Sequence, residues 1–276
     1  MNYAFGIKLQ EGGDIIKAGV CYDLDKFELK YASYITDQNK LLVSHKLHVG
    51  NVLYLNLKQN LNGFNKYFNF LNSNSEIVDN IFLKYPFNIK EFQFDSLIQD
   101  KSLQLELYDF KYILNIMWWR QLRQENWRFF VDAISERSQT AKYVVHVGTF
   151  GNVTIPDIKE NCTSPKNKIV YISNEDMIIK APGYIWAYLK SITTGVDEEF
   201  VVIGHNSLYK KNPDRSEFCE VDICDEIKWL KNSQFGSLRH LPSLGYTFCC
   251  RPEDVANKIG YFPFKAIENV ASTPQA

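Results

Sequence analysis

Long apolar segments are missing from this chain of 276 residues. No run approaches the roughly 18 apolar residues that a membrane-spanning helix needs, so we expect no association with a membrane. Near the start of the chain, charged side chains interrupt what would be the apolar core of a secretory signal peptide. They are Lys8, Glu11, Asp14 and Lys17. The sequence as written therefore predicts an intracellular protein.

An excess of charge of either sign is also missing, since the formal net charge is −1. Proteins that bind nucleic acids electrostatically are usually basic, so this balance argues against such a function, although a local basic patch is compatible with it. Apolar residues make up 45% and charged residues 23%, an ordinary globular composition. Aromatic residues make up 14%, so many must lie in a core or at contacts between molecules.

Several signatures of catalysis or ligand binding are missing as well. We find no internal repeat, glycine-rich phosphate loop, Cys-x-x-Cys pair or Ser-His-Asp arrangement. His45 and His48 are three residues apart, but their neighbours alternate as in a strand, where such positions point to opposite faces. His205 follows an apolar run and is expected to be a hydrogen-bonded structural group. The sequence thus predicts no metal site.

The most strongly patterned stretch is Tyr112–Asp157. A strand-like run comes first, and a loop with two tryptophans follows. Apolar residues at i, i+3, i+4 and i+7 then indicate one face of a helix, and an alternating strand with a glycine-marked exit completes the unit. In chain order these parts are Tyr112–Ile116; Trp118 and Trp119; Trp127, Phe130, Val131 and Ile134; Lys142–Val147; and Gly148–Gly151.

The residues at the boundaries between these strands and the helix resemble those of the DNA/RNA non-specific endonucleases, the ββα-metal nucleases, and in particular their insect double-stranded-RNA-degrading branch. In that family an Asn ends a strand, an Asn-Trp pair opens a helix, and a Gly-Thr-aromatic-Gly stretch leads to Pro-Asp. The matching residues here are Asn115, Asn126 with Trp127, Gly148–Gly151 and Pro156 with Asp157. Further pieces follow in the family's order: Tyr3–Gly6, Cys21–Asp23, Pro182–Trp186, Val202–Asn206, Trp229–Leu230 and Gly245–Cys249.

The resemblance implies an α+β, ββα-metal nuclease-like fold with a central, mostly antiparallel sheet flanked by helices. We expect one domain over residues 1–260 and an extended C-terminal arm over residues 261–276. The remaining local expectations are a hairpin or meander over residues 2–34, a helix or long bend over Tyr184–Ile192, a core strand over Phe200–His205, a helix over Asp222–Lys231 and a loop over residues 233–244.

The catalytic positions of the family are filled by other residue types. By position, Ser96 stands where the family has its general base, a histidine, and a serine does not accept a proton near neutral pH unaided. Gln124 stands at the magnesium-holding asparagine, and Val131, beside Asp132, at the helix glutamate. Because magnesium requires oxygen ligands in strict geometry, we expect no catalytic residue and no cofactor. Asn115, Asn126 and Trp127 are retained.

Three functions compete on this basis. The first is a catalytically inactive nuclease fold that assembles with itself, for example as a crystalline matrix or occlusion-type protein of an insect virus or its host. The second is a magnesium-dependent endonuclease, with Asp95 or His146 as base and Gln124 or Asp132 as metal ligand. The third is a pseudoenzyme that binds nucleic acid through Arg120, Arg123, Arg128 and Arg137, with stacking on Trp118 or Trp119.

Six cysteines complete the pattern. Cys219 and Cys224 are close in sequence, and Cys249 and Cys250 are adjacent in the closing segment. A bridge between these two places would staple the C-terminal part of the chain, as the resemblance implies, and buried free thiols are the alternative. Cys21 and Cys162 are candidates for bridges within or between chains.

The asparagine- and aromatic-rich segment 59–80 is either a surface loop or a contact with another molecule.

Overall fold

A computed structural model of the protein describes residues 2–8, 14–23, 26, 28–36, 91–107, 114–156, 167–173, 178–207 and 215–263. Several features of the sequence lie outside these ranges: His45, His48, segment 59–80, Asp157, Cys162 and residues 264–276 of the expected C-terminal arm.

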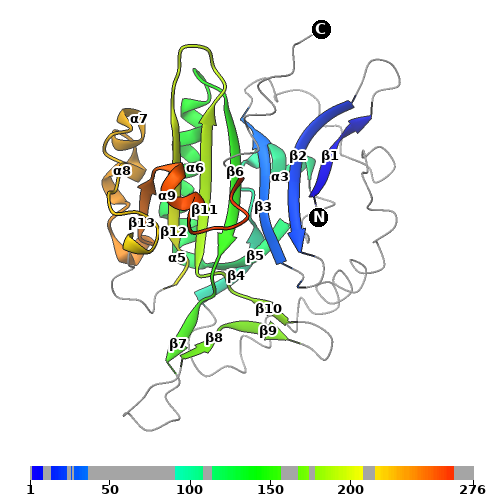
Figure 1. Ribbon diagram of the computed structural model, residues 1–276, viewed down its shortest axis with the longest axis vertical. Helices are drawn as coiled ribbons and strands as arrows, with labels where there is room; N and C mark the ends of the chain where they lie inside the picture. Colours follow the sequence, from blue (N-terminus) through cyan, green and yellow to red (C-terminus); the bar gives the residue numbers. More distant parts are fainter. Residues whose placement is uncertain are drawn as a thin grey trace.

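A seven-stranded antiparallel sheet forms the centre of the molecule (Figure 1). Its strand order is β1-β2-β3-β6-β11-β12-β13, so β1 and β13 are the edges. The predicted α+β class with a central antiparallel sheet is therefore confirmed. The strands are β1 (Asn2–Lys8), β2 (Asp14–Asp23), β3 (Glu28–Ile35), β6 (Tyr143–Phe150), β11 (Tyr184–Ser191), β12 (Glu199–His205) and β13 (Thr247–Cys250).

The predicted meander at the start of the chain is also confirmed, because β1, β2 and β3 pair in sequence. Strand β3 then pairs with β6, which follows it only after more than a hundred residues. In this register Tyr31 lies opposite Gly148, and Ser33 lies opposite His146.

Helices cover one face of the sheet and form the larger core with it (Figure 1). Helix α6 buries Trp127, Phe130 and Ile134 and packs Val131 partly against the core, which confirms the predicted helical spacing. No helix within the described ranges is long and apolar enough to cross a membrane. The helices on this face are α3 (Lys101–Glu106), α5 (Arg120–Gln124), α6 (Asn126–Arg137), α7 (Lys228–Lys231) and α8 (Gln234–Leu238).

Aromatic side chains dominate the opposite face of the sheet. Trp186 and Tyr188 of β11 and Phe248 of β13 are fully buried there. Helix α9 (Pro252–Ala256) and the segment after it cover them. The ring of Phe262 lies 5.1 Å from the rings of both Trp186 and Tyr188, measured between centroids.

A second, two-stranded sheet leads directly into the helical layer. Strand β4 (Phe92–Ser96) pairs with β5 (Asn115–Trp119), and α5 begins at the residue after β5. Helix α6 then starts two residues after α5 ends. The order β4-β5-α5-α6 is a strand–strand–helix unit of the kind that the resemblance implies. Trp118 and Trp119, predicted to lie in a loop, are instead strand residues and buried, because β4 supplies their pairing partners.

Between β6 and β11 the chain forms a small β-arm, which projects from one end of the main sheet (Figure 1). Backbone hydrogen bonds among Val153, Val170 and Ala181 tie its parts together where they meet the main sheet. The arm comprises β7 (Thr154–Pro156) paired with β8 (Asn167–Ile169), and β9 (Tyr171–Ser173) paired with β10 (Ile178–Lys180).

The prediction of a helix or bend over Tyr184–Ile192 is wrong. This segment is β11, a central strand that pairs with β6 on one side and β12 on the other. Its residues from Tyr184 to Leu189 are all buried, so both faces are apolar and the alternation that marks a half-exposed strand is missing.

Two predictions near the C-terminus are also wrong. Only Lys228–Lys231 of the expected helix Asp222–Lys231 is helical, because the preceding residues are held in turns against β13. The expected loop at 233–244 contains α8 and a 3₁₀ turn at Pro242–Leu244; the side chain of Ser233 caps α8 by accepting a hydrogen bond from the Gly236 N–H.

Candidate functional site

The strand–strand–helix unit brings the predicted catalytic loop and the predicted metal-ligand position together. An ion pair joins them: Arg123 Nη2 of α5 lies 2.8 Å from Asp95 Oδ2 of β4. Beside it, Gln124 Nε2 lies 3.4 Å from Gln93 Oε1. Partial burial of the guanidinium lowers the pKa of Arg123, and the neighbouring Asp95 carboxylate opposes this shift. A cation of the chain itself therefore occupies the space between the strand and the helix.

Ser96, in the predicted position of the general base, is the last residue of β4 and is buried. Its carbonyl oxygen accepts hydrogen bonds from Trp118 Nε1 at 3.1 Å and from the Gln99 side-chain amide. Its N–H donates to Asp95 Oδ1 at 2.8 Å. Ser96 pairs with the retained Asn115 across the two strands. These contacts hold the end of β4 in place, and they are structural contacts of the Ser96 backbone.

The retained residues of α6 also have structural contacts. Asn126 is fully buried, and its Nδ2 donates to the carbonyl oxygens of Leu238, at 3.2 Å, and Gly245, at 2.6 Å. Trp127 is buried, and its ring centroid lies 5.5 Å from that of Trp118. Asn126 thus ties the helix start to the C-terminal loops. Val131 and Asp132, at the position of the family's glutamate, are partly buried and exposed, respectively.

The arginines predicted to bind nucleic acid differ in their exposure and in their partners within the chain. Arg120 is exposed at the start of α5. Arg128 is half exposed, but its Nε donates to the Gln124 carbonyl oxygen at 2.8 Å and its Nη2 lies 3.9 Å from Glu125 Oε2. Arg123 is held by Asp95. Of these three arginines, Arg123 is committed to an internal ion pair, and Arg128 bonds to the last residue of α5.

Gly148 and Trp186 explain two further pieces of the resemblance in structural terms. A Cβ at position 148 would lie 2.3 Å from the Trp186 ring and 2.5 Å from the Lys30 carbonyl oxygen, so only glycine fits there. The indole Nε1 of Trp186 donates to the Thr149 carbonyl oxygen at 3.2 Å. The glycine is required because the Trp186 ring occupies the space beside position 148, directly opposite it on β11.

His146, the other possible base, lies within the sheet. Its Nδ1 is 2.6 Å from Ser33 Oγ, its ring stacks on Tyr188, and within the described residues its buried Nε2 has no hydrogen-bond partner. Burial lowers its pKa from 6.5 to about 4. The imidazole is therefore neutral near pH 7. It belongs to β6 of the main sheet, whereas Asp95 and Arg123 belong to β4 and α5.

A buried asparagine that sequence reasoning noted only as the end of a strand proves central. Asn206 accepts a hydrogen bond from the Trp119 N–H at 2.6 Å and donates to the carbonyl oxygens of Met117 and Pro182, both at 2.8 Å. It is fully buried. Asn206 therefore joins β5 of the strand–strand–helix unit to the main sheet.

The four C-terminal cysteines form two disulfides, Cys219–Cys250 and Cys224–Cys249. The predicted disulfide link between the Cys219–Cys224 segment and the Cys249–Cys250 pair is thus confirmed, and it consists of two bridges. Cys21 keeps a free thiol. Burial raises the pKa of this thiol, so it is less reactive than an exposed one.

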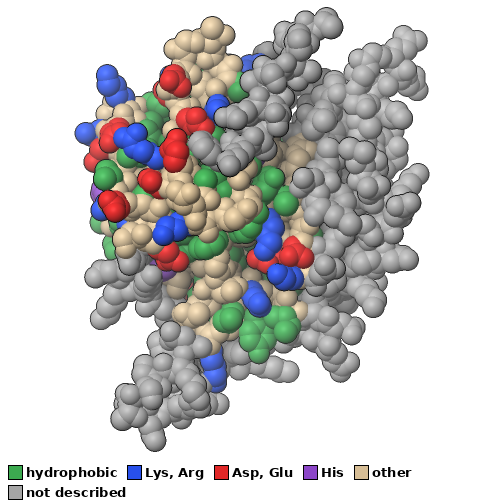
Figure 2. All heavy atoms as spheres, viewed as in Figure 1, with side chains coloured by type: hydrophobic (Ala, Val, Ile, Leu, Met, Phe, Trp, Pro, Cys, Tyr) green, Lys and Arg blue, Asp and Glu red, His purple; other side chains and the backbone are tan. Residues whose placement is uncertain are grey.

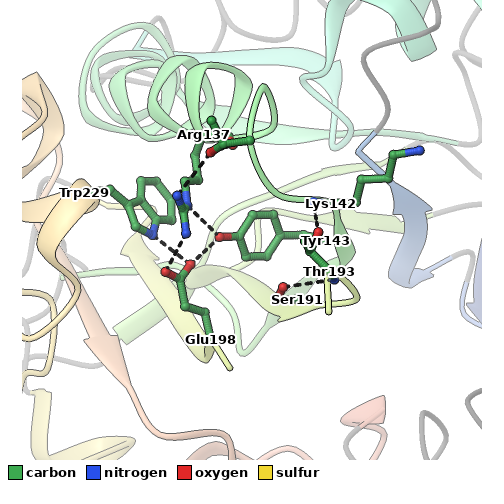
Figure 3. Close-up of polar contacts among 8 residues, drawn as sticks. Arg137, Lys142, Tyr143, Ser191, Thr193, Glu198 and Trp229 are labelled. Carbon is green, nitrogen blue, oxygen red and sulfur yellow. Dashed lines mark hydrogen bonds and ion pairs between the residues drawn. The ribbon is translucent and has the colours of Figure 1, made fainter. Parts of the chain in front are cut away.

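A polar cluster that the sequence did not predict lies where β11 ends and β12 begins (Figure 3). Glu198 accepts hydrogen bonds from Arg137 Nη2 at 2.8 Å, from Trp229 Nε1 at 3.0 Å and from the Tyr143 hydroxyl. Arg137 Nε also donates to the Tyr143 oxygen at 3.0 Å. The cluster borders a cavity of about 420 Å³. Because Glu198 is saturated by donors from the chain, it acts as a structural clamp between α6, β6 and α7.

No family model matches this chain, and no curated protein matches it. Among solved structures, 18 chains match. One belongs to a crystal structure of the EndoG/EndoGI complex, described as showing the mechanism of EndoG inhibition. It shares 7% sequence identity, covers 92% of this chain and 83% of that chain, and has a TM-score of 0.46. We therefore infer function from the contacts of this chain's own residues.

Proposed function

We propose that this protein is a non-catalytic member of a nuclease-like fold and that its role is structural, through association with further copies of itself. The Asp95–Arg123 ion pair carries the first part. A metal-dependent nuclease needs a base and an oxygen-lined metal site between these two elements. Here the aspartate is paired with a cation, and the two neighbouring side chains, Gln93 and Gln124, are neutral amides.

The β-arm supports the second part. Ile169, Tyr171 and Ile178 are all exposed, with Ile178 exposing 54% of its surface. Strand alternation and the pairing of Ile178 with Ser173 place all three on one face, whereas Val170 and Ile179 on the other face are buried. Figure 2 shows hydrophobic side chains gathered over β9 and β10 on this projection. Such a face is suited to bury itself against a second copy.

A cleavage assay tests the non-catalytic part. Plasmid DNA and double-stranded RNA are incubated with the protein and magnesium or manganese, with and without EDTA. We expect no cleavage, and we expect magnesium to leave the melting temperature unchanged because no site binds it. Cleavage that EDTA abolishes would show a working endonuclease, and the variants Asp95→Asn, Asp132→Asn and His146→Gln would then locate its base and metal ligand.

Sedimentation velocity over a hundredfold range of protein concentration tests the structural part. We expect a sedimentation coefficient that rises with concentration. A monomer at every concentration, under both oxidising and reducing conditions, would contradict the structural role even if cleavage were absent. Binding of nucleic acid without cleavage, weakened by salt, would instead favour the pseudoenzyme function around Arg120 and Arg128.

A further inference from the structure

Strand β13 is an edge of the main sheet, yet its outer side is not open. Cys249 makes both of its outward backbone hydrogen bonds to the segment 219–224, which we call the edge cap. Its carbonyl oxygen accepts from the Ile223 N–H at 3.0 Å, and its N–H donates to Asp222 Oδ1 at 3.1 Å. Thr247 N–H donates to the Arg239 carbonyl oxygen at 3.0 Å. An edge strand without such cover is a template for pairing with another chain.

The two disulfides fasten the edge cap from opposite sides of the sheet. Cys249 and Cys250 are adjacent in β13, so their side chains point to opposite faces. Cys224 and Cys249 lie in the core beneath the helices, whereas Cys219 and Cys250 lie in the aromatic core on the other face. One bridge therefore holds each end of the cap. Either bridge alone keeps the cap tethered to β13.

The remaining links of the edge cap are non-covalent. Asp222 forms an ion pair with the buried Arg239, whose Nη2 also lies 3.3 Å from Asp225. The Cys224 N–H donates to Asp222 Oδ1 at 3.0 Å, which stabilises the turn within the cap. With both bridges open, these contacts can break and re-form, and the outward groups of Cys249 become available.

We propose that the edge cap is a redox-controlled lock on self-assembly, and that opening both bridges lets β13 pair with β13 of a second copy. This inference rests on the proposed structural function and names a contact through which copies associate. Each bridge takes two electrons and two protons from a dithiol, which is oxidised to its own disulfide, and yields two thiols. The strand Thr247–Cys250 carries no charge, so two copies approach antiparallel without like-charge repulsion.

Serine variants test the lock without relying on reductant access to buried sulfur. The variant that replaces all four cysteines has no bridge, and two matched controls, Cys219→Ser/Cys250→Ser and Cys224→Ser/Cys249→Ser, each keep one. Cys21→Ser controls for the free thiol. We expect sedimentation velocity to show at least a tenfold lower dissociation constant for the four-serine variant than for wild type, and no change for the three controls. Equal association of all forms would overturn the proposal.

Hydrogen exchange tests whether association uses β13, and it is read at the amide of residue 249, which donates to Asp222 of the edge cap. In oxidised wild type this amide should be protected. In the four-serine variant it should exchange at least tenfold faster at low concentration and regain protection at high concentration. Association without this recovery would place the contact elsewhere and refute the inference. If the four-serine variant is not folded, the same measurement on wild type in dithiothreitol replaces it.

The outcomes also separate this inference from the proposed function. Cleavage of nucleic acid would refute the proposed function whatever the cap does. Self-association of wild type that neither reduction nor the serine variants alter would leave the structural role standing and reject the lock alone.

Discussion

Arg123 and Asp95 are 28 positions apart in sequence and 2.8 Å apart in space, one on α5 and the other on β4. Their ion pair closes the strand–strand–helix unit at the place where the resemblance would put a metal ion. The Arg123 side chain is only 18% exposed, so its charge depends on Asp95 for compensation.

Replacing Asp95 by asparagine tests this dependence with little other change. The asparagine oxygen can still accept the Ser96 N–H, but the charge opposite Arg123 is lost. We expect the free energy of unfolding to fall by about 1 kcal/mol, a modest value because Asp95 is partly exposed. Urea unfolding measures it, and a double-mutant cycle with Arg123→Ala isolates the coupling. The exposed Asp132→Asn on α6 is the control. An equally large fall in the free energy of unfolding for this variant would show that the effect does not come from the Asp95–Arg123 ion pair.

Replacing Asn206 should lower the free energy of unfolding more than replacing Asp95 does. The variant Asn206→Ala leaves the Trp119 N–H and the carbonyl oxygens of Met117 and Pro182 without partners inside the protein. Since each unsatisfied buried group costs about 1–3 kcal/mol, we expect a loss of at least about 3 kcal/mol in urea unfolding. The exposed Asn152→Ala should stay within about 0.5 kcal/mol of wild type. A loss of less than 1 kcal/mol at Asn206 would contradict its role as the joint between the two sheets.

The sequence allows the prediction of those elements whose pattern is local. The spacing of Trp127, Phe130 and Ile134 predicts α6 because one face of that helix meets the core and the other meets solvent. The apolar run at Phe200–His205 predicts β12. The proximity of Cys219 and Cys224 to the Cys249–Cys250 pair in the fold also follows from the resemblance.

What the sequence does not predict depends on contacts that are distant along the chain. Strand β11 is apolar on both faces because the helical layer covers one face of the sheet, and α9 with the segment after it covers the other. Nothing within Tyr184–Ser191 distinguishes this strand from a buried helix. The Asp95–Arg123 pair and the clamp on Glu198 join residues far apart in sequence. Whether a catalytic position is vacant or filled by an ion pair can be decided only once its neighbours in space are known.

Disrupting the apolar face of the β-arm should weaken association. The variant Ile178→Asp places a charge on an exposed side chain in a three-residue strand, so we expect the fold to be kept and the dissociation constant to rise at least tenfold, as measured by sedimentation velocity. The matched control is Ile192→Asp, at a comparably exposed isoleucine away from the arm, which should associate as wild type does. Equal effects at both sites would mean that the arm is not the contact.

His146 should make stability depend on pH in a defined window. Its pKa is about 4 in the folded protein and 6.5 ordinarily, because burial disfavours the charged imidazole. The unfolded chain therefore binds a proton at a higher pH than the folded chain does. The stabilisation is complete above pH 6.5, is lost as the pH falls toward 4 and changes no further below it. The shift corresponds to about 3 kcal/mol over this range.

The variant His146→Gln removes this titration and keeps a side chain that can bond to Ser33. Urea unfolding from pH 7 to pH 4 should show a shallower loss of stability for the variant than for wild type, and the difference between the two slopes reports His146 alone. The exposed His240→Gln should reproduce the wild-type slope. If the His146 variant also follows the wild-type slope, the imidazole is solvated in the folded protein, and the packing of Ser33, His146 and Tyr188 within the sheet must be looser than the structure shows.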